Sequence, residues 1–389
     1  MSRFHSYLSS ASSIIQAYKG EEPFVHFIKK KFAANKKFGS RDRKIITSLC
    51  YSYLRTSHLL ASDTTEQKIV KGLFLCESKK NDLLQQLYPE LNEKIACTTE
   101  EKCNFLEVDP ASIFPFVSAL GEEIDALDFC YSFFRQPLLF LRLRPKKKHT
   151  VITKLNAADI SYSLLKNDCI SIQNTTSLDT IIKLNKEAVV QDYNSQRVFD
   201  FLDDHKEIIS KQNKPDVWDC CAASGGKSIL LYDKLNGNIK LTVSDIRKNI
   251  LHNLEQRLQE AVIPIYKTFA ADLLQGIPKD KEDVFDIIIC DVPCTGSGTW
   301  SRTPEELAFF KAGSIDEYAS KQAKIAGNAT SLLKKEGLFF YITCSVFKKE
   351  NEDVVSLLQK NNGLNLLHME YLKGYQMQAD TLFVAVLKK

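Results

Sequence analysis

Apolar and polar positions alternate in two different ways along the C-terminal half of the chain. Short apolar runs that are typical of buried strands cover residues 216–220, 240–244, 265–270, 284–290, 338–342, 364–367 and 381–387. Stretches with helical periodicity fall between them, at about residues 227–235, 246–260 and 350–360. Strands that alternate with helices predict an α/β fold with a doubly wound, mostly parallel sheet.

A further helix is predicted before the run at 338–342. Ser314 and Glu317 have the spacing of a capping box, and Lys334 and Lys335 precede Gly337, as basic residues often do at the end of a helix. The pattern therefore predicts one long helix from about Ser314 to Lys335.

Two cysteines follow predicted strands. Cys294 belongs to the segment Asp291-Val-Pro-Cys-Thr-Gly-Ser-Gly298, and Cys344 to the segment Tyr341-Ile-Thr-Cys-Ser345. The carboxyl ends of such strands form the edge of the sheet that binds ligands. Two thiols there suit a reaction that adds a sulfur nucleophile to a substrate and later needs a second residue to reverse the addition. Both could instead be core cysteines, but the flanking Gly, Pro and small polar residues favour open loops.

Composition indicates a globular protein of more than one domain. The chain has 389 residues, 44% hydrophobic and 26% charged, and one core rarely serves so long a chain. No segment resembles a leader or approaches the ~20 apolar residues that span a bilayer, so we expect a soluble, cytoplasmic protein. The 11 cysteines include no Cys-x-x-Cys pair, which argues against disulfides and against a metal site. The net charge of +4 permits binding of nucleic acid without requiring it.

A glycine-rich turn is predicted between the first of these strands and its helix. Such a turn lets the backbone approach a ligand and directs N–H groups toward it. The segment Cys221-Ala-Ala-Ser-Gly-Gly-Lys-Ser228 nearly matches a nucleoside-triphosphate loop, but Cys221 stands where that loop needs Gly. The alternative is a nucleoside ligand, with Asp245 bound to ribose hydroxyls and Asp272 to an adenine amino group. A turn or helix-cap role for each aspartate also stays open.

Three motifs together resemble those of the RsmB/Nop/Sun RNA cytosine-5 methyltransferases. They are Asp219-Cys-Cys-Ala-Ala-Ser-Gly-Gly-Lys227, the Cys294 segment, and the Cys344 segment followed by Lys349-Glu-Asn-Glu-Asp-Val-Val355. The segment Val190-Gln-Asp-Tyr-Asn-Ser-Gln196 is similar to the family's entry into its catalytic domain. Upstream, residues 38–43 and 49–55 resemble the NusB-like domain of the bacterial ribosomal-RNA branch, and residues 137–142 resemble the start of its small RNA-binding subdomain.

The resemblance implies three domains. A helical NusB-like RNA-binding domain is expected over residues 1–135, a small α/β RNA-binding subdomain over 136–189, and a Rossmann-like methyltransferase domain over 190–389. Ser224 stands where the family has Pro, and Arg302 is the one retained member of two arginines usual after the Cys294 loop. Residues 59–132 resemble nothing that we can place.

The resemblance also implies a reaction. It is methyl transfer from S-adenosylmethionine to carbon 5 of a cytosine in RNA, with small-subunit ribosomal RNA favoured over transfer RNA. The family assigns Cys344 to attack on carbon 6, Asp291 to a hydrogen bond with ring nitrogen 3, and Cys294 to breakdown of the adduct. The cofactor is expected to contact Cys221, Ala222, Ala223, Ser224, Gly225, Gly226, Lys227, Asp245, Asp272 and Asp291, with Lys227 orienting groups rather than reacting.

Two other functions stay open. In a DNA cytosine methyltransferase the cysteine of the Pro-Cys segment is the nucleophile, and nothing would require Cys344. An RNA-binding scaffold could keep the fold without catalysis, although the presence of Asp291, Cys294 and Cys344 together speaks against it.

Basic residues gather in two runs that could contact RNA. The first includes Lys29, Lys30, Lys31, Lys36, Lys37, Arg41, Arg43 and Lys44, the second is Lys146, Lys147 and Lys148, and Arg302 is a further candidate. A charge run is commonly just a solvated face. Beside a methyltransferase that must bind folded RNA and extrude one base, contact with phosphates is an equally good interpretation. We expect a monomer with RNA as its partner.

Overall fold

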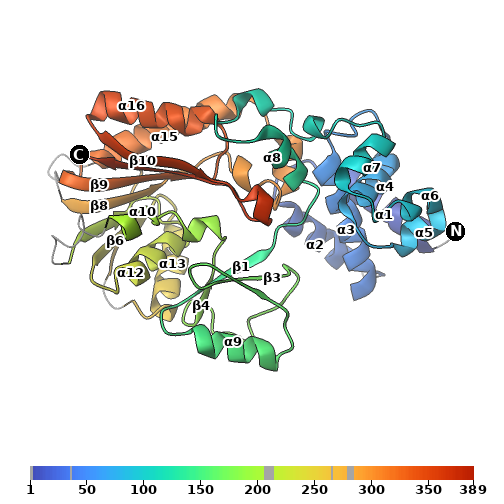
Figure 1. Ribbon diagram of the computed structural model, residues 1–389, viewed down its shortest axis with the longest axis horizontal. Helices are drawn as coiled ribbons and strands as arrows, with labels where there is room; N and C mark the ends of the chain where they lie inside the picture. Colours follow the sequence, from blue (N-terminus) through green and yellow to red (C-terminus); the bar gives the residue numbers. More distant parts are fainter. Residues whose placement is uncertain (1–2, 36, 206–213, 264–265, 278–283) are drawn as a thin grey trace. The chain divides into compact units, whose positions relative to one another are not determined.

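The computed structural model describes residues 3–35, 37–205, 214–263, 266–277 and 284–389 (Figure 1). The chain divides into two compact units. Unit 1 comprises Met1–Leu120, Asp125–Gln136 and Thr299–Ala312, and unit 2 comprises Gly121–Ile124, Pro137–Gly298 and Gly313–Lys389. In the described ranges, no helix is both long and apolar enough to cross a membrane.

Unit 1 is helical. Its helices are α1 (Arg3–Ala17), α2 (Phe24–Ala34), α3 (Ser40–Thr56), α4 (Thr65–Cys76), α5 (Asp82–Leu87), α6 (Pro89–Glu93), α7 (Thr99–Phe105), α8 (Ala126–Ser132) and α14 (Pro304–Phe309), with short 3₁₀ turns η1 (Pro110–Ile113) and η2 (Val117–Ala119). Residues 59–132, which the sequence left without a parallel, therefore form helices and turns of this unit, except for Gly121–Ile124, which belong to unit 2. The expected helical N-terminal region is confirmed.

The segment Thr299–Ala312 packs with the N-terminal helices although it follows the Cys294 loop in the chain. The buried guanidinium of Arg55 on α3 donates hydrogen bonds to the carbonyl oxygens of Ser301, at 2.6 Å, and Phe133, at 3.2 Å. The ring of Phe309 meets that of Tyr18 edge to face, with centroids 5.3 Å apart. A buried guanidinium needs several acceptors, so Arg55 fixes this segment within unit 1.

Unit 2 contains the doubly wound sheet that the sequence predicts. Its strand order is β10-β11-β9-β8-β5-β6-β7. The parallel strands are β5 (Asp216–Asp219), β6 (Lys240–Asp245), β7 (Tyr266–Ala270), β8 (Phe285–Asp291) and β9 (Leu333–Thr343), and the antiparallel ones are β10 (Asn365–Leu372) and β11 (Leu382–Lys388). The strand order reverses beside β5, which is where such sheets bind ligands, at the carboxyl ends of their strands.

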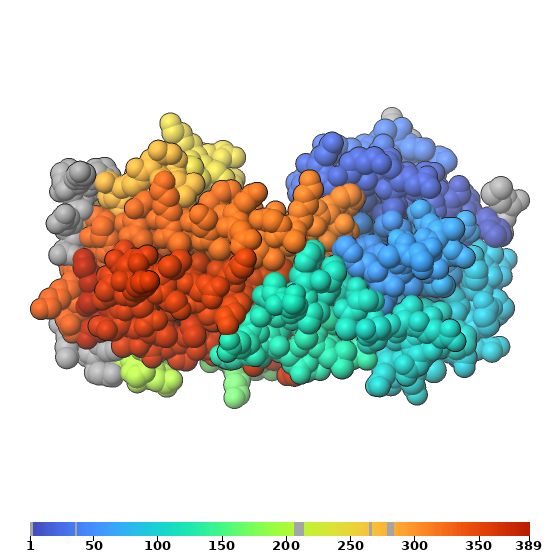
Figure 2. Space-filling view, turned by 90° about the horizontal axis from the view of Figure 1, so that it is seen from above, coloured from blue at the N-terminus to red at the C-terminus, as the bar shows by residue number. Residues whose placement is uncertain are grey.

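Helices cover both faces of this sheet (Figure 1). They are α10 (Phe201–Asp204), α12 (Gly226–Lys234) and α13 (Lys248–Glu260) on one face, and α15 (Gly313–Thr330) and α16 (Glu352–Asn362) on the other. Figure 2 views unit 2 from the side of α15 and α16, whose orange to red atoms close over the sheet. Because both faces are covered, most of β8 and the part of β9 from Gly337 onward are buried, with Phe339, Phe340 and Tyr341 fully buried.

The prediction for α15 is wrong at its C-terminal end. The helix begins at Gly313, within one residue of the predicted start, but it ends at Thr330. Lys334 and Lys335 belong instead to β9, which begins at Leu333. Lys334 there pairs with Asp286 of β8 at 3.0 Å, so the basic residues belong to the sheet.

A second, smaller sheet in unit 2 lies earlier in the chain. It has the strand order β2-β3-β1-β4, formed by β1 (Leu139–Leu143), β2 (Ser163–Leu165), β3 (Cys169–Ile172) and β4 (Ala188–Val190). Helix α9 (Lys148–Ala157) packs on it through buried Val151 and Leu155. The 3₁₀ turns η3 (Asn194–Gln196), η4 (Ser297–Thr299), η5 (Lys348–Glu350) and η6 (Tyr375–Met377) complete the described elements.

Candidate functional site

The thiols of Cys294 and Cys344 meet at the carboxyl edge of the large sheet. Cys294 lies in the loop after β8, and Cys344 directly follows β9, the parallel neighbour of β8. Their Sγ atoms are 3.2 Å apart, and both side chains are partly exposed. The hydrogen bond with Cys344 and the burial of the site raise the pKa of Cys294 well above its ordinary value. The structure thus joins two residues that lie fifty positions apart in the sequence.

Backbone contacts fix the distance between the two cysteine loops. The amide of Gly298 donates to the carbonyl oxygen of Cys344 at 2.8 Å, and the amide of Thr381 donates to Gly298 at 2.9 Å. A Cβ atom on Gly298 would lie 2.0 Å from the carbonyl oxygen of Thr381. Only glycine therefore fits at the end of the Asp291–Gly298 segment.

Lys227 and Asp291 form an ion pair beside the thiols. The ammonium of Lys227, in the first turn of α12, lies 2.5 Å from a carboxylate oxygen of Asp291 at the end of β8. Burial alone would lower the pKa of Lys227, but the charge of Asp291 outweighs it, and Cys344 also contributes, so the pKa is raised. A positive charge is therefore held near the sulfur of Cys344.

A buried carboxyl, that of Asp219, lies close to this ion pair. Asp219, at the end of β5, is 1% exposed and accepts a hydrogen bond from the hydroxyl of Ser228 at 2.6 Å, while its other oxygen has no hydrogen-bond partner. Burial raises the pKa of Asp219 to about 7. The sequence analysis gave Asp219 no role. Its position directly before the glycine-rich turn could have indicated that it lies at the site.

The turn between β5 and α12 has the open backbone that the sequence predicts. Gly225 has φ +79°, and a Cβ atom there would lie 2.2 Å from a methyl group of Leu254 on α13. Ala223 also has a positive φ, of 45°. Gly226 begins α12, so the amides of this helix start face the carboxyl edge of the sheet, where they suit a polar ligand.

Ser224 replaces the expected Pro without leaving its polar atoms unused. Its hydroxyl and its carbonyl oxygen both accept hydrogen bonds from Arg257 of α13, at 2.7 and 3.0 Å. The same guanidinium donates to the side chain of Asn185 at 2.8 Å. Arg257 thus binds the turn through the hydroxyl of Ser224, and a proline side chain has no oxygen to accept this hydrogen bond.

Asp245 and Asp272 lie after the next two strands, as predicted. Asp245 accepts hydrogen bonds from the amide of Ala223, at 3.1 Å, and from the guanidinium of Arg247, at 2.9 Å. Burial would raise its pKa, but these hydrogen bonds outweigh it and lower the pKa. Asp272 accepts from the amide of Leu274 at 3.0 Å. Both expected cofactor carboxylates therefore lie on one edge of the sheet, and both already cap local backbone.

Glu350 is a buried acid that sequence reasoning recorded within a motif but did not assign to the site. Its side chain is fully buried and accepts hydrogen bonds from Thr295 and Ser345, the residues that follow the two cysteines. The signal for it was an acid six positions after Cys344 in a segment that resembles the family. In the described part of the chain, no three His, Cys, Asp or Glu residues are placed to hold a metal ion.

The first basic run lies on α2 and α3 of unit 1. Lys30 pairs with Glu22 at 2.7 Å, and Lys31 lies over the ring of Phe27. Lys29, Arg41 and Arg43 are exposed on the same two helices. Lys36 lies outside the described residues. Arg302 belongs to the segment of unit 1 that follows the Cys294 loop.

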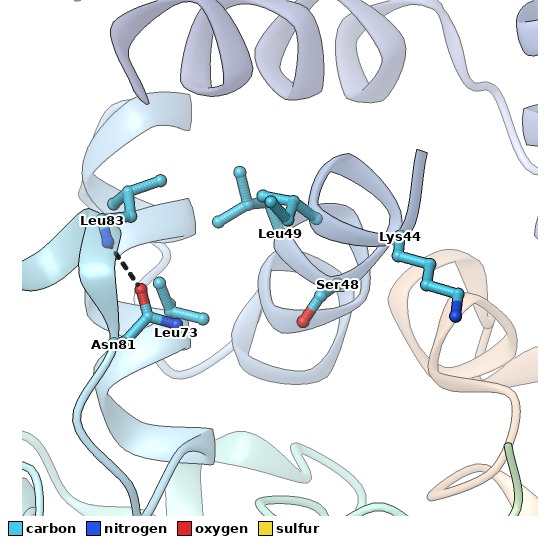
Figure 3. A pocket seen from close by; sticks show the side chains of 7 residues that line it. Lys44, Ser48, Leu49, Leu73, Asn81 and Leu83 are labelled. Carbon is cyan, nitrogen blue, oxygen red and sulfur yellow. Dashed lines mark hydrogen bonds between the residues drawn. The ribbon is translucent and has the colours of Figure 1, made fainter. Parts of the chain in front are cut away.

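A hollow near this run is mostly apolar (Figure 3). It has a volume of about 220 Å³, and leucines from α3, α4 and α5 line it, with Lys44 and Ser48 at one side. Asn81 points its side-chain oxygen at the amide of Leu83, 3.0 Å away, and so caps α5. The hollow therefore offers few free polar groups to a ligand.

The second basic run lines a larger hollow in unit 2. This basic hollow has a volume of about 520 Å³, and its cationic lining residues are Arg144, Lys146, Lys147 and Lys186. One acid, Asp233, also lines it, and the carboxylate of Asp233 is bound by Arg142 and Arg144 at 2.6 and 2.7 Å. Lys148 differs, because it pairs with Asp168 at 2.7 Å. The sequence analysis did not identify Lys186, which lies 38 positions after the end of the run.

Comparisons with known proteins agree with the fold and with the motifs. Residues 206–386 match the family described as 16S rRNA methyltransferase RsmB/F. The chain is 27% identical over 204 residues to the ribosomal RNA small subunit methyltransferase B of Xanthomonas campestris pv. campestris, and 30% identical over 154 residues to that of Shewanella oneidensis. These matches cover 49% and 38% of this chain, and only 44% and 34% of the relatives, so the chain matches less than half the length of either.

Solved structures share the architecture at low identity. The crystal structure of PH0851 superposes with a TM-score of 0.71 and 18% identity, and the match covers 100% of both chains. NSun6 from Pyrococcus horikoshii, solved with SFG, superposes with a TM-score of 0.58 and 14% identity over 71% of this chain and 97% of that one. These likenesses establish the fold.

Proposed function

We propose that this chain transfers a methyl group from S-adenosylmethionine to carbon 5 of a cytosine in RNA. Its residues 206–386 belong to the RsmB/Nop/Sun family of methyltransferases. The observation that carries the proposal is the 3.2 Å separation of the Cys294 and Cys344 sulfurs beside the Lys227–Asp291 ion pair. A nucleophilic thiol, a second thiol, a carboxylate and a cation are the groups that this reaction uses.

Cytosine explains why a thiol is needed. Carbon 5 of the ring is too weak a nucleophile to attack a methyl sulfonium directly. Addition of a thiolate to carbon 6 moves the ring electrons toward carbon 5, which then attacks the methyl group. Removal of the proton from carbon 5 and departure of the thiolate restore the ring. The ammonium of Lys227 interacts electrostatically with Cys344, which is the thiol that we propose as the nucleophile.

The other residues of the site have complementary roles. Asp291 takes up a proton from solvent and donates it in a hydrogen bond to ring nitrogen 3 while negative charge builds on the base. Cys294, whose raised pKa keeps it a protonated thiol, assists the collapse of the adduct as an acid. It gives its proton to the departing sulfur of Cys344, 3.2 Å away, while solvent takes the proton from carbon 5. The pairing of Lys227 with Asp291 orients the carboxylate for this contact.

The glycine-rich turn and the two strand-end acids suit S-adenosylmethionine. When bound, this molecule supplies an electrophilic methyl group on a sulfonium. The open backbone at Gly225 and the amides at the start of α12 suit its polar atoms, and the ionised carboxylate of Asp245 is an acceptor for ribose hydroxyls. Residues Cys221, Ala222, Ala223, Ser224, Gly226, Asp272 and Asp291 complete the proposed binding surface.

The RNA is proposed to be small-subunit ribosomal RNA, as the names of the two curated relatives suggest. The proposed contacts are Lys29, Lys30, Lys31, Arg41, Arg43, Arg302 and the second basic run, Lys146, Lys147 and Lys148. The basic hollow supports the contact at the second run, since the carboxylate of Asp233 is already neutralised by two arginines.

Methyl transfer to purified RNA tests this function. The full-length protein should transfer labelled methyl groups from S-adenosylmethionine to small-subunit ribosomal RNA, and Cys344→Ala should not. Bisulfite sequencing should then find one cytosine that is protected in RNA from the parent strain and unprotected in RNA from a deletion strain. Loss of a site in transfer RNA instead would reassign the substrate. If no RNA pool becomes labelled, an RNA-binding scaffold without catalysis would be the better interpretation.

A further inference from the structure

Glu350 lies beneath both cysteine loops with no exposed surface. It ends the 3₁₀ turn η5, before α16. A buried carboxylate is costly unless hydrogen-bond donors surround it. Four donors converge on the two oxygens of Glu350, and they come from three separate segments of unit 2.

One oxygen of Glu350 joins the two cysteine loops directly. Its Oε1 accepts from the hydroxyl of Thr295 at 2.5 Å and from the hydroxyl of Ser345 at 2.6 Å. Thr295 follows Cys294 in the chain, and Ser345 follows Cys344. One carboxylate oxygen therefore spans the two loops one residue away from each sulfur.

The other oxygen fixes the backbone of the Cys294 loop. Oε2 accepts from the amide of Thr295 at 2.9 Å and from the side-chain amide of Gln322 on α15 at 2.8 Å. The same Gln322 nitrogen donates to the carbonyl oxygen of Pro293 at 3.0 Å. Cys294 is thus held on both sides, through Pro293 and through Thr295.

The residue after Glu350 holds the Cys344 loop in the same way. The side-chain oxygen of Asn351 accepts from the hydroxyl of Thr343 at 2.6 Å, and its nitrogen donates to the carbonyl oxygen of Ser345 at 2.8 Å. Asn351 is also fully buried. Glu350 is the member of this pair that reaches both loops.

We propose that Glu350 is a positioning residue that sets the separation of the Cys294 and Cys344 sulfurs and, through its negative charge, keeps the proton on Cys294. The expected effect of Glu350 on methyl transfer rests on the proposed function. Its effect on the separation of the two sulfurs does not. The charge of Glu350 is among the causes that raise the pKa of Cys294. An apolar side chain in this place could fill the space but could not gather donors from both loops.

Two substitutions separate position from charge. Glu350→Gln keeps the size of the side chain, and the hydroxyls of Thr295 and Ser345 can rotate to accept from the new amide group, so the loops should stay in place while the charge is lost. Glu350→Ala removes both. Glu352→Ala is the matched control, because Glu352 lies two residues away and bonds to Tyr371 instead of the cysteine loops.

The first measurement is the rate of disulfide formation between Cys294 and Cys344 with diamide. This azo compound takes the two thiol hydrogens and becomes a hydrazine, and the linked peptides are then identified by mass spectrometry. Glu350→Ala should slow the cross-link at least about tenfold, since sub-ångström displacements have large effects on such reactions. Glu350→Gln and Glu352→Ala should stay within about twofold of the wild type.

The second measurement reports the charge. In Glu350→Gln, the pH at which iodoacetamide alkylates Cys294 at half its maximal rate should move to lower pH, because a negative charge that favours the protonated thiol is gone. In Glu350→Ala, kcat for RNA methylation should fall by about tenfold to a hundredfold while KM for S-adenosylmethionine changes little. Thermal denaturation and calorimetric binding of S-adenosylmethionine establish that each variant is folded.

Unchanged cross-linking in a folded Glu350→Ala would overturn the positional claim, and an unmoved alkylation profile in Glu350→Gln would overturn the claim about charge. If Glu350→Ala does not fold, Thr295→Val and Ser345→Ala replace it, because each removes one of the two hydroxyl contacts. Cross-linking needs neither RNA nor methyl transfer. It therefore decides the positional claim even if the proposed function fails.

Discussion

The ammonium nitrogen of Lys227 lies 2.5 Å from a carboxylate oxygen of Asp291, so the first turn of α12 reaches the end of β8. The lysine belongs to the proposed cofactor turn, and the aspartate belongs to the segment that carries Cys294. This pair therefore connects the two halves of the proposed site.

Loss of this pair should slow catalysis without unfolding the protein. Lys227→Met should reduce single-turnover methyl transfer at least tenfold, because a hydrogen bond to a charged group contributes about 1.5–3 kcal/mol. Lys234→Met is the matched control, since Lys234 ends the same helix and pairs with the exposed Asp203 at 2.7 Å. Equal rates for the two variants would remove Lys227 from the mechanism.

Asp219 should make stability depend on pH. Its pKa in the folded protein is about 7, above the ordinary aspartate value of 3.8. The folded state therefore binds a proton that the unfolded state has lost, and the stability that this proton contributes declines as the pH rises through this interval. Asp219→Asn cannot ionise and should flatten the fall in melting temperature between about pH 4 and about pH 7.

The control for this prediction is Asp216→Asn. Asp216 begins the same strand, and its side chain is 33% exposed. It should keep the wild-type dependence on pH. An Asp219→Asn profile parallel to that of the wild type would mean that Asp219 is ionised in the folded protein across this range.

Asp245 should determine the affinity for the cofactor. Asp245→Ala should weaken binding of S-adenosylmethionine by about 1.5–3 kcal/mol, the usual size of hydrogen bonds to a charged acceptor. Isothermal titration calorimetry measures this loss, and ATP should not compete. Tight ATP binding without binding of S-adenosylmethionine would revive the triphosphate-loop interpretation of residues 221–228.

The basic hollow should bind RNA phosphates. Replacing Lys146, Lys147 and Lys186 together with Gln should weaken RNA binding and lower the log–log salt slope by roughly 0.7 for each lost contact to single-stranded RNA. Lys154→Gln is the control, because Lys154 is not among the proposed contacts and its charge is paired with Glu187 at 2.7 Å. A slope that is equal in both variants would make the second basic run a solvated face.

The sequence predicted the parts of the site that depend on strand ends. Cys294, Cys344, Asp245 and Asp291 each follow or end an apolar run, and parallel strands bring such positions to one edge. The partners of these residues could not be predicted in the same way. Glu350 reaches the site through hydrogen bonds to Thr295 and Ser345, which no periodicity records.

Contacts between residues far apart in the chain explain what the sequence patterns did not predict. The helix α15 ends at Thr330 because the chain enters β9 at Leu333, where Lys334 finds Asp286 on the neighbouring strand. A local reading of Lys334 and Lys335 as helix-ending residues had no access to that partner. Likewise, Thr299–Ala312 groups with unit 1 because Arg55, far earlier in the chain, binds the carbonyl oxygen of Ser301.

The roles of the two thiols form the central claim, and a denaturing gel tests them most directly. With RNA and S-adenosylmethionine present, Cys294→Ala should attack and methylate once, then stall as a slowly migrating protein–RNA band, because the adduct through Cys344 cannot collapse. Cys344→Ala and the double variant Cys294→Ala/Cys344→Ala should give no such band. A covalent band from Cys344→Ala, absent from Cys294→Ala, would contradict the account and make Cys294 the nucleophile.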